Sequence, residues 1–444
     1  ANLSTVSDSL GGKGVLWELF EVNPATLNLY VKLCSNSPYL TTILTSYPGM
    51  IDELLDCLIL DHLPTKQSLR RVMNELVKGA QIEGQELTDV ILAFKHAQHL
   101  RVGVREILGK DSLADSHKSL SDIIEVSLQE IANEHFRLLV EKHGEPIVEH
   151  GEMAGEPASL TLVGLGKLGG QEPNFHSDVD ILFLYDGAGN TRPTNRQHKT
   201  RPTSNHHFFN ELAKRILQSS TRTRPHGRLF DMDSKLRATH QHAPLAISID
   251  DYEDYLKNEK IPLWQTMGLC KARVIVGTDQ AQQRVAGIIS NTIGKVDANA
   301  DLQSQMFQAR LDSESGATDR NLKRFEGGTM DVEYIVQFLQ LLHGDNTAIQ
   351  RPGTVQALES LREQKLLEED DATALIKSYI FLRRVESGLR LMDTTHRHDL
   401  PEQALELEKL ASLLGYENPQ SLVTVCRRYR QANRQRFNKI FSRS

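Results

Sequence analysis

The sequence predicts an α+β protein, mostly helical, in which a compact mixed module lies between an N-terminal and a C-terminal helical bundle. From about residue 14 to 142 apolar residues recur at helical spacing, as in IDELLDCLIL at 51–60. At Ser159 this period gives way to short apolar runs bounded by glycines, which are typical of strands. From about Asp301 the 3.6-residue period returns and continues to the C-terminus.

The N-terminal bundle carries clear boundary signals. Pro38, Pro48 and Pro64 are predicted to stand where helices begin or end, because proline lacks an N–H group and restricts the residue before it. The 444 residues exceed what one hydrophobic core usually serves. We therefore expect three domains: an N-terminal helical domain at 1–118, the mixed module at 119–290 and a C-terminal helical bundle at 291–444.

The central module is expected to alternate strands and helices. SLTLVGLG and DVDILFLYD predict two strands on either side of a glycine-rich turn, and GRLFDMDSKLRA predicts a third strand by its alternation. HFFNELAKRILQSST predicts an amphipathic helix. DDYEDYLKN predicts a helix, and LWQTMGLCKARVIVG a helix that leads into a short strand. The polar stretch at 186–207 has no apolar period and predicts a loop; its basic part, from Arg192 to His207, is expected to be solvated.

Composition excludes several classes of protein. Lys plus Arg total 51 against 58 Asp plus Glu, and this net charge of −7 disfavours a protein that grips nucleic acid through its overall field. The four cysteines show no CxxC spacing, so neither a zinc site nor a disulfide framework is indicated, and a reducing cytoplasm fits. No run approaches the roughly 20 apolar residues that span a bilayer, so we expect a soluble protein without a membrane partner. The chain begins with Ala rather than Met, and we expect it to be part of a longer polypeptide.

Two aspartates carry the central chemical prediction. Asp178 and Asp180 are two apart on a predicted strand, so both carboxylates point to one face. Two like charges placed together favour a divalent cation such as Mg²⁺, which prefers oxygen ligands. Asp233, on the later strand, is the natural third ligand. Three carboxylates can hold two metal ions about 4 Å apart, the arrangement that commonly runs phosphoryl and nucleotidyl transfer. An Asp-x-Asp at a strand start is also often a solvated edge or a turn cap.

The glycine-rich turn at 164–170 predicts a phosphate site. Its backbone is unobstructed by Cβ atoms at Gly166, Gly169 and Gly170, and Lys167 supplies a positive charge. It is not a P-loop, because no Gly-Lys-Ser/Thr closes it. Lys271 and Arg273 also reach toward the triphosphate in this interpretation, or are solvated charges at a strand edge. The full set predicted to bind the nucleotide is Gly166, Lys167, Gly169, Gly170, Ser177, Arg237, Lys271 and Arg273.

Other charged groups are expected to be structural. Glu326, Asp331 and Glu333 flank a Gly-Gly pair at a helix start, where capping is favoured over catalysis. The Arg383-Arg384 pair and the basic RRYRQANRQRF segment near the C-terminus predict solvated helix faces.

The segment GLGKLGGQEPNFHSDVDILFLYD is similar to the signature of the bacterial glutamine synthetase adenylyltransferases. These are bifunctional regulators whose two halves each carry a nucleotidyltransferase module of the DNA polymerase β type. The resemblance continues in order through GRLFDMDSKLR, KARVIVGTDQ and EGGTMDVEYIVQFLQLLHG. The N-terminal stretches NLYVKLCSNSPYLTTILTSYPGMIDELLD and LTDVILAFKHAQHLRVGVREILG resemble the region that leads into the C-terminal, adenylylating half.

The resemblance implies a reaction and its site. AMP would pass from ATP to a tyrosine of glutamine synthetase with release of pyrophosphate. Asp178 and Asp180 would bind both magnesium ions, and Asp233 would help to deprotonate the tyrosine hydroxyl. Glutamine and a PII signalling protein would be regulators.

Two departures from the family pattern concern residues near this site. The family usually has Arg-x-Arg-Pro-x-Gly after the third carboxylate, where this chain has KLRATH at 235–240, and Trp-Glu where it has Trp264-Gln265. Three alternatives remain: phosphorolytic removal of AMP from the same protein, a catalytically weakened module that binds nucleotide or effector, and nucleic-acid tailing, which the net charge disfavours.

Overall fold

The N-terminal third of the chain is helical, as the apolar period predicts. In the computed structural model its helices are α3 (Pro24–Asn36), α4 (Pro38–Ser46), η1 (Pro48–Met50), α6 (Lys66–Glu83), α7 (Leu87–Ile107) and α8 (Leu113–His143). The three prolines mark helix starts: Pro38 opens α4, Pro48 opens η1, and Pro64 lies just before α6. The structure describes residues 24–50, 62–151, 153–193, 201–233, 244–258, 261–297, 300–393 and 398–442.

The central module contains a small mixed sheet in the strand order β5-β3-β2-β7, with β6 also paired to β3. β2 (Leu160–Gly164) is antiparallel to β3 (Val179–Tyr185) and to β7 (Arg273–Val276), whereas β5 (Met232–Asp233) and β6 (Ala246–Ser248) run parallel to β3. A separate two-stranded sheet joins β1 (Glu145–Val148) and β4 (Gly189–Arg192). The α+β class is therefore confirmed.

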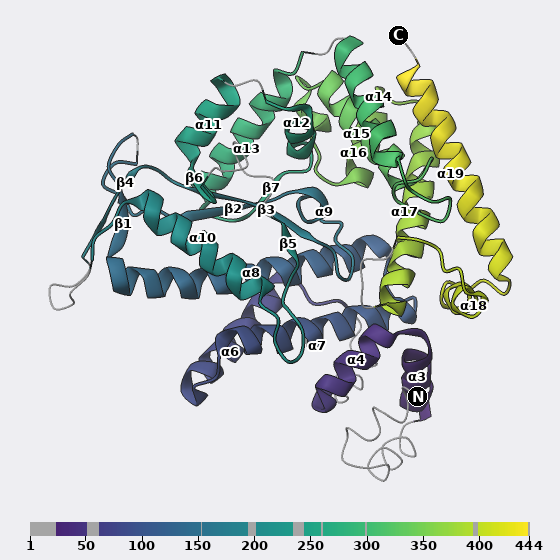
Figure 1. The fold of residues 1–444 in the computed structure, drawn as a ribbon, viewed down its shortest axis with the longest axis horizontal. Coiled ribbons are helices and arrows are strands. Elements are labelled where there is room, and N and C mark those ends of the chain that lie inside the picture. Colours follow the sequence, from purple (N-terminus) through teal and green to yellow (C-terminus); the bar gives the residue numbers. More distant parts are fainter. Residues whose placement is uncertain are drawn as a thin grey trace.

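Helices cover both faces of this sheet (Figure 1). Leu162, Ile181 and Phe183 belong to one apolar core, which they share with residues of α8 and α10 (Asn205–Thr221). Leu182 and Leu184 belong to a second core, shared with the helices that follow in the chain. Burial on both faces explains why β3 reads as an almost continuous apolar run after Asp180.

The remaining helices follow the predicted order. The central module includes α9 (Gly166–Gly169), α11 (Ile249–Asn258), α12 (Leu263–Leu269) and α13 (Asp279–Gly294). The C-terminal region contains α14 (Ala300–Glu314), α15 (Thr329–Leu342), η2 (Thr347–Ile349), α16 (Thr354–Glu363), α17 (Glu369–Met392), α18 (Ala404–Leu413) and α19 (Pro419–Phe441). None of the described helices combines the length and the apolar character of a bilayer-spanning segment.

Two details of the central module differ from the sequence predictions. The segment at 186–207 was predicted to be a loop, but it contains β4, which Thr191 anchors through a hydrogen bond to the backbone oxygen of His143. The strand predicted over GRLFDMDSKLRA (227–238) begins later than expected: of the described residues 227–233, only Met232 and Asp233 pair with β3. Residues 234–243 lie outside the described residues. The predicted domain boundaries at 118 and 290 fall inside the continuous helices α8 and α13, and the division stays a prediction.

Candidate active site

The two carboxylates of the Asp-x-Asp pair lie at the start of β3. Asp178 is exposed just before the strand, and Asp180 is half-buried within it. Asp180 stands directly opposite Asp233 in the parallel β3–β5 register, so the backbones of the second and third predicted ligands are neighbours. The side chain of Asp233 lies outside the described residues. The backbones of Asp180 and Asp233 therefore lie side by side on adjacent strands, whereas the prediction that both side chains bind metal stays a prediction.

The glycine-rich turn packs against the same point. Gly166 opens α9 with a φ of 52°, and a Cβ atom there would lie 2.5 Å from Oδ2 of Asp180. The amide of Leu165 donates to the backbone oxygen of Asp180 at 2.9 Å. At Gly169 a Cβ would overlap the backbone oxygen of Lys271, and at Gly170 it would lie 2.9 Å from that of Pro352. Glycine is therefore required because other backbone and the Asp180 carboxylate approach the turn closely.

Ser177 has a local structural contact. Its hydroxyl oxygen accepts a hydrogen bond from the amide of Asn174 at 2.8 Å, and its own amide donates to the Asn174 backbone oxygen at 3.1 Å. These two bonds close the turn that leads into Asp178. Arg237, also predicted to bind the nucleotide, lies outside the described residues.

The predicted phosphate-binding cations form ion pairs with carboxylates. Lys167 is paired with Glu333 of α15 and donates to the Tyr379 hydroxyl at 3.0 Å. Lys271, only 5% exposed, donates to Thr354 Oγ1 at 2.8 Å and lies 3.3 Å from Oε2 of Glu172 and 3.7 Å from Oε2 of Glu333. The alternative of a solvated strand-edge charge is therefore wrong for Lys271.

Arg273 faces a different neighbour. Its Nη2 atom lies 2.5 Å from Oε1 of Glu125, which is almost fully buried on α8. Its Nε atom donates to the backbone oxygen of Gly169 at 3.0 Å, and Nη2 donates to that of Leu168 at 3.1 Å. Arg273 thus braces the end of the glycine-rich turn against α8, whereas Lys167 and Lys271 meet in the carboxylate network on the C-terminal side.

Burial and mutual charge set the protonation of this network. Burial lowers the pKa of Lys167 to about 8, although the neighbouring Glu333 opposes the shift. For Glu333 burial acts to raise the pKa, but the charges of Lys167 and Lys271 outweigh it and hold the pKa far below its ordinary value. Burial, together with Glu172 and Glu333, raises the pKa of Tyr379 well above its ordinary value. At neutral pH the tyrosine is therefore an uncharged donor between two ionised carboxylates.

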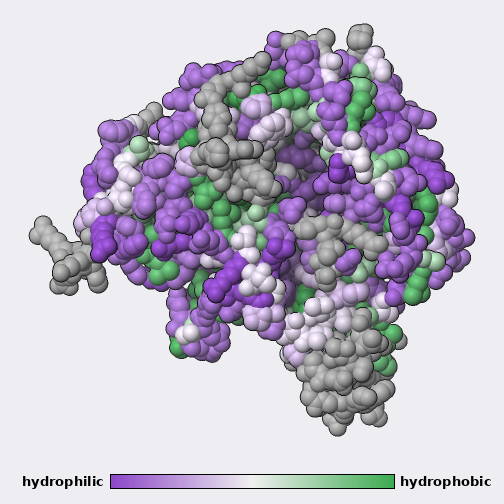
Figure 2. All heavy atoms as spheres, in the orientation of Figure 1, coloured by the Kyte–Doolittle hydropathy of each residue, from purple (hydrophilic) through white to green (hydrophobic). Residues whose placement is uncertain are grey.

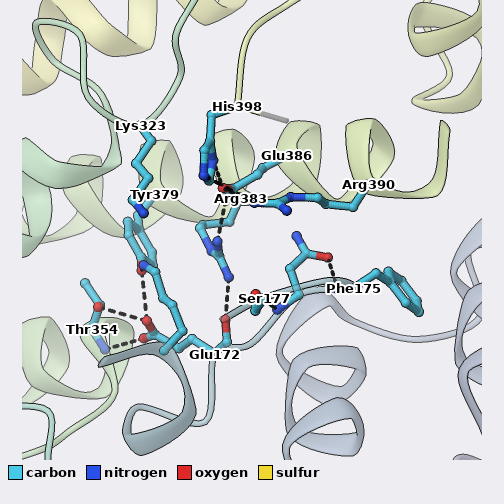
Figure 3. A network of polar contacts seen from close by, with 12 residues as sticks. Glu172, Phe175, Ser177, Lys323, Thr354, Tyr379, Arg383, Glu386, Arg390 and His398 are labelled. Atoms are coloured by element: carbon cyan, nitrogen blue, oxygen red, sulfur yellow. Dashed lines mark hydrogen bonds and ion pairs between the residues drawn. The ribbon is translucent and has the colours of Figure 1, made fainter. Parts of the chain in front are cut away.

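The network extends along α17 and includes residues that the sequence analysis did not select (Figure 3). Tyr379, Arg383 and Arg390 follow one another at helical spacing and face the 170–177 segment. Tyr379 donates to Glu172 Oε2 at 2.8 Å, Arg383 donates to the Glu172 backbone oxygen, and Arg390 donates to that of His176 at 3.4 Å. Burial lowers the pKa of Arg390, and the charge of Asp178 is among those that oppose this shift. Polar residues that recur at helical spacing among the buried apolar residues of α17 were the signal that could have identified them.

Several charged residues predicted to be solvated or capping are buried in ion pairs. Arg383 is 3% exposed and pairs with Glu386, which corrects the solvated interpretation, whereas Arg384 is exposed as predicted. Asp331 does cap its helix, because Oδ2 accepts from the Gly327 amide at 3.0 Å. It also lies 2.5 Å from Nη2 of Arg310, and both side chains are fully buried. On α19 the solvated interpretation is wrong for Arg430 and Arg434, which are buried, whereas Arg427 and Arg428 are exposed as predicted.

The molecule is hollowed next to the turn that leads into Asp178. Figure 2 shows a hollow near the centre of one face, bordered mostly by hydrophilic residues. On the N-terminal side a cavity of about 350 Å³ is lined by Tyr39, His96, Ser177 and Asp231, among others. Burial lowers the pKa of His96 to about 3, so its imidazole is neutral. Among the side chains that the structure describes, no group of three or more His, Cys, Asp or Glu has metal-binding geometry; Asp233 is outside that set.

Comparison with known proteins gives two family matches that divide the chain. The model of the family described as glutamate-ammonia ligase adenylyltransferase matches residues 27–288, which include the turn, the Asp-x-Asp pair and Asp233. The model described as GlnD PII-uridylyltransferase matches residues 300–442, which include α15 and α17.

Curated relatives agree with the first of these matches. The chain is 28% identical over 418 residues to the bifunctional glutamine synthetase adenylyltransferase/adenylyl-removing enzyme of Thioalkalivibrio sulfidiphilus, covering 93% of the chain and 42% of the relative. It is 29% identical over 380 residues to the protein of the same name from Methylococcus capsulatus, covering 84% and 40%. The chain thus spans about two fifths of the length of these relatives.

Proposed function

Because the chain belongs to the glutamate-ammonia ligase adenylyltransferase family, we propose that it transfers AMP from ATP to a tyrosine hydroxyl of glutamine synthetase. The central module is, in this proposal, a nucleotidyltransferase module of the DNA polymerase β type in a cytoplasmic protein. The relatives that carry glutamine synthetase in their name support the choice of acceptor.

One observation carries the proposal. Asp178 and Asp180 lie two residues apart at the start of β3, Asp180 is paired in register with Asp233, and Gly166 packs against the Asp180 carboxylate. Carboxylate oxygens are the donors that Mg²⁺ prefers, so these three aspartates would hold a pair of magnesium ions. Such ions would offset the negative charge that develops on the phosphate oxygens. Asp233 would also help to remove the proton of the tyrosine hydroxyl.

The glycine-rich turn would receive the triphosphate. Gly166 lies at the start of α9 beside Asp180, where backbone N–H groups would meet a phosphate. The amides of Gly169 and Gly170 donate within the turn to the backbone oxygens of Leu165 and Gly166, at 2.9 and 3.2 Å, so these two glycines would shape the turn. Ser177 holds the turn that follows. An ammonium group has three N–H donors, and Lys167 donates to Glu333 and to the Tyr379 hydroxyl. One donor remains for a phosphate oxygen without loss of the ion pair.

This role of Lys167 has its own test. We expect Lys167→Met to raise the KM for ATP about tenfold, the effect of about 1.4 kcal/mol of lost binding. An unchanged KM for ATP, with a lowered midpoint of thermal unfolding, would assign Lys167 to structure alone. Lys271, Arg273 and Arg237 belong to the same proposal in supporting positions.

The reaction is tested with α-labelled ATP, Mg²⁺ and unmodified glutamine synthetase. We expect label on the synthetase and release of pyrophosphate. The double variant Asp178→Asn with Asp180→Asn should abolish labelling while retaining the fold by circular dichroism. Labelling at the wild-type rate by this variant would refute the assignment of the carboxylates. Binding of ATP without turnover by the unaltered protein would instead favour a regulatory module.

A second candidate reaction is removal of AMP from modified glutamine synthetase. The printed names of the relatives include an adenylyl-removing activity, and the chain spans only part of their length. Incubation of modified synthetase with phosphate, followed by detection of ADP, distinguishes this reaction from the forward transfer. Glutamine and a PII protein are the proposed regulators, and each is tested by its effect on the rate of either reaction.

A further inference from the structure

The segment at 170–177 connects the glycine-rich turn to the carboxylate strand, and its backbone needs outside support. Gln171 and His176 have φ angles of 55° and 56°, in the left-handed region that residues other than glycine rarely adopt. Each such residue costs about 1–3 kcal/mol and persists only where its surroundings hold it. Because Asp178 follows two residues after His176, the shape of this segment sets where the carboxylates lie.

Glu172 is the main point of support. It is only 8% exposed, and its carboxylate accepts hydrogen bonds from the Tyr379 hydroxyl at 2.8 Å, from Thr354 Oγ1 at 3.1 Å and from the Thr354 amide. Lys271 adds a cation 3.3 Å away. The backbone oxygen of the same residue accepts from Arg383. Figure 3 shows Thr354 of α16 and Tyr379 and Arg383 of α17 converging on Glu172. Two helices and the connection between α12 and β7 therefore hold this one residue of the segment.

The far end of the segment is held by the same helix. Arg390 of α17 donates to the backbone oxygen of His176 at 3.4 Å. Arg383 is in turn fixed by its ion pair with Glu386, whose carboxylate lies 2.5 Å from Nδ1 of His398. A single face of α17 therefore contacts both ends of the segment that precedes Asp178.

We propose that Glu172, Tyr379 and Arg383 are positioning residues for Asp178 and Asp180, so that α17 of the C-terminal bundle sets the geometry of the catalytic carboxylates. The inference rests on the proposed function for its effect on rate. Two of the three residues, Tyr379 and Arg383, come about 200 positions after the carboxylates in the chain, and both act through Glu172.

Two variants and one matched control test the role. Tyr379→Phe removes a single hydroxyl, and Arg383→Met keeps an unbranched stem but removes the guanidinium donors. Arg384→Met alters the next residue, which is exposed. Because a displacement of about 1 Å at a reacting centre can cost about 100-fold in rate, we expect kcat to fall about 100-fold in Arg383→Met and about tenfold in Tyr379→Phe. The Mg²⁺ concentration for half-maximal rate should rise in both, with the KM for glutamine synthetase unchanged. Arg384→Met should match the wild type.

A readout that does not depend on activity completes the design. We expect backbone amides at 174–180 to exchange hydrogen for deuterium faster in Arg383→Met and Tyr379→Phe than in Arg384→Met, with exchange in α8 unchanged. Unchanged exchange at 174–180 would overturn the inference, as would a loss of kcat that follows only the unfolded fraction. If Arg383→Met does not fold, the kcat and the hydrogen exchange of Tyr379→Phe test the inference. If the wild-type protein transfers no AMP, the proposed function fails, and the exchange data still decide whether α17 holds the segment.

Discussion

Replacing Gly166 by alanine separates backbone strain from displacement of a catalytic carboxylate. The φ of 52° places residue 166 in the left-handed region, where alanine costs about 1–2 kcal/mol of stability. The new Cβ would also lie 2.5 Å from Oδ2 of Asp180, whereas an ordinary contact begins at 3.4 Å, so the carboxylate must move by about 0.9 Å. A shift of that size at a reacting centre costs about 100-fold in rate, or about 2.7 kcal/mol in activation free energy.

Gly84→Ala is the matched control for this variant. Gly84 ends α6 with a φ of 69°, and a Cβ there meets nothing within 4 Å. Urea denaturation should give both variants a similar loss of stability, while initial rates of AMP transfer should fall only in Gly166→Ala. A wild-type rate in Gly166→Ala would refute the close approach of Asp180 to the turn. Equal loss of rate in the two variants would assign the effect to stability.

Three further predictions concern buried groups away from the carboxylates. Asp331→Asn removes the nearer of the two carboxylates that pair with the fully buried Arg310, the other being Glu314 at 3.4 Å, and should lower the free energy of unfolding by about 3 kcal/mol in urea titrations; a change below about 1 kcal/mol would contradict this. Burial raises the pKa of Glu106 to about 7. The folded state then binds more protons than the unfolded state between pH 4.5 and 7, so stability falls as pH rises through this window. Glu106→Gln should therefore be more stable than the wild type above pH 7, and no difference at pH 8 would refute the shift. Burial also raises the pKa of the Cys270 and Cys426 thiols to about 12, so both should escape Ellman's reagent until the protein unfolds, as read by peptide mass spectrometry.

The elements that form the carboxylate site were predictable because local patterns specify them. Alternation and flanking glycines indicate β2 and β3, and the spacing of Asp178 and Asp180 places both on one face. The glycine-rich turn was predicted as a phosphate site, which stays a prediction; in the structure its glycines allow the close approach of the Asp180 carboxylate and the Lys271 backbone. The third strand was predicted to begin too early, because the alternation starts at Leu229 whereas, of the described residues 227–233, only Met232 and Asp233 pair with β3.

The ion-pair partners were not predictable, because they depend on contacts between segments far apart in the chain. Glu172 meets Tyr379 across 207 positions, and Lys167 meets Glu333 across 166. No local pattern in the sequence indicates such a pairing. The Arg383-Arg384 pair and the basic residues of α19 were therefore assigned to solvent. Arg383 and Arg384 illustrate the limit. They are adjacent and of the same type, yet Arg383 is buried against the 170–177 segment and Arg384 is exposed.

The buried network also places a physical constraint on how the C-terminal bundle relates to the carboxylates. Three cations, Lys167, Lys271 and Arg383, are balanced by the carboxylates of Glu172, Glu333 and Glu386. Removing one member of a buried pair costs about 3–5 kcal/mol because the other charge is left uncompensated. Separation of α15 and α17 from the central module would break the pairs of Glu333 with Lys167 and Lys271, and with them the hydrogen bonds of Tyr379 and Arg383 to Glu172. The two family matches, at 27–288 and 300–442, therefore describe parts of one site, since Glu333 and Arg383 come from the second part and Lys167 and Glu172 from the first.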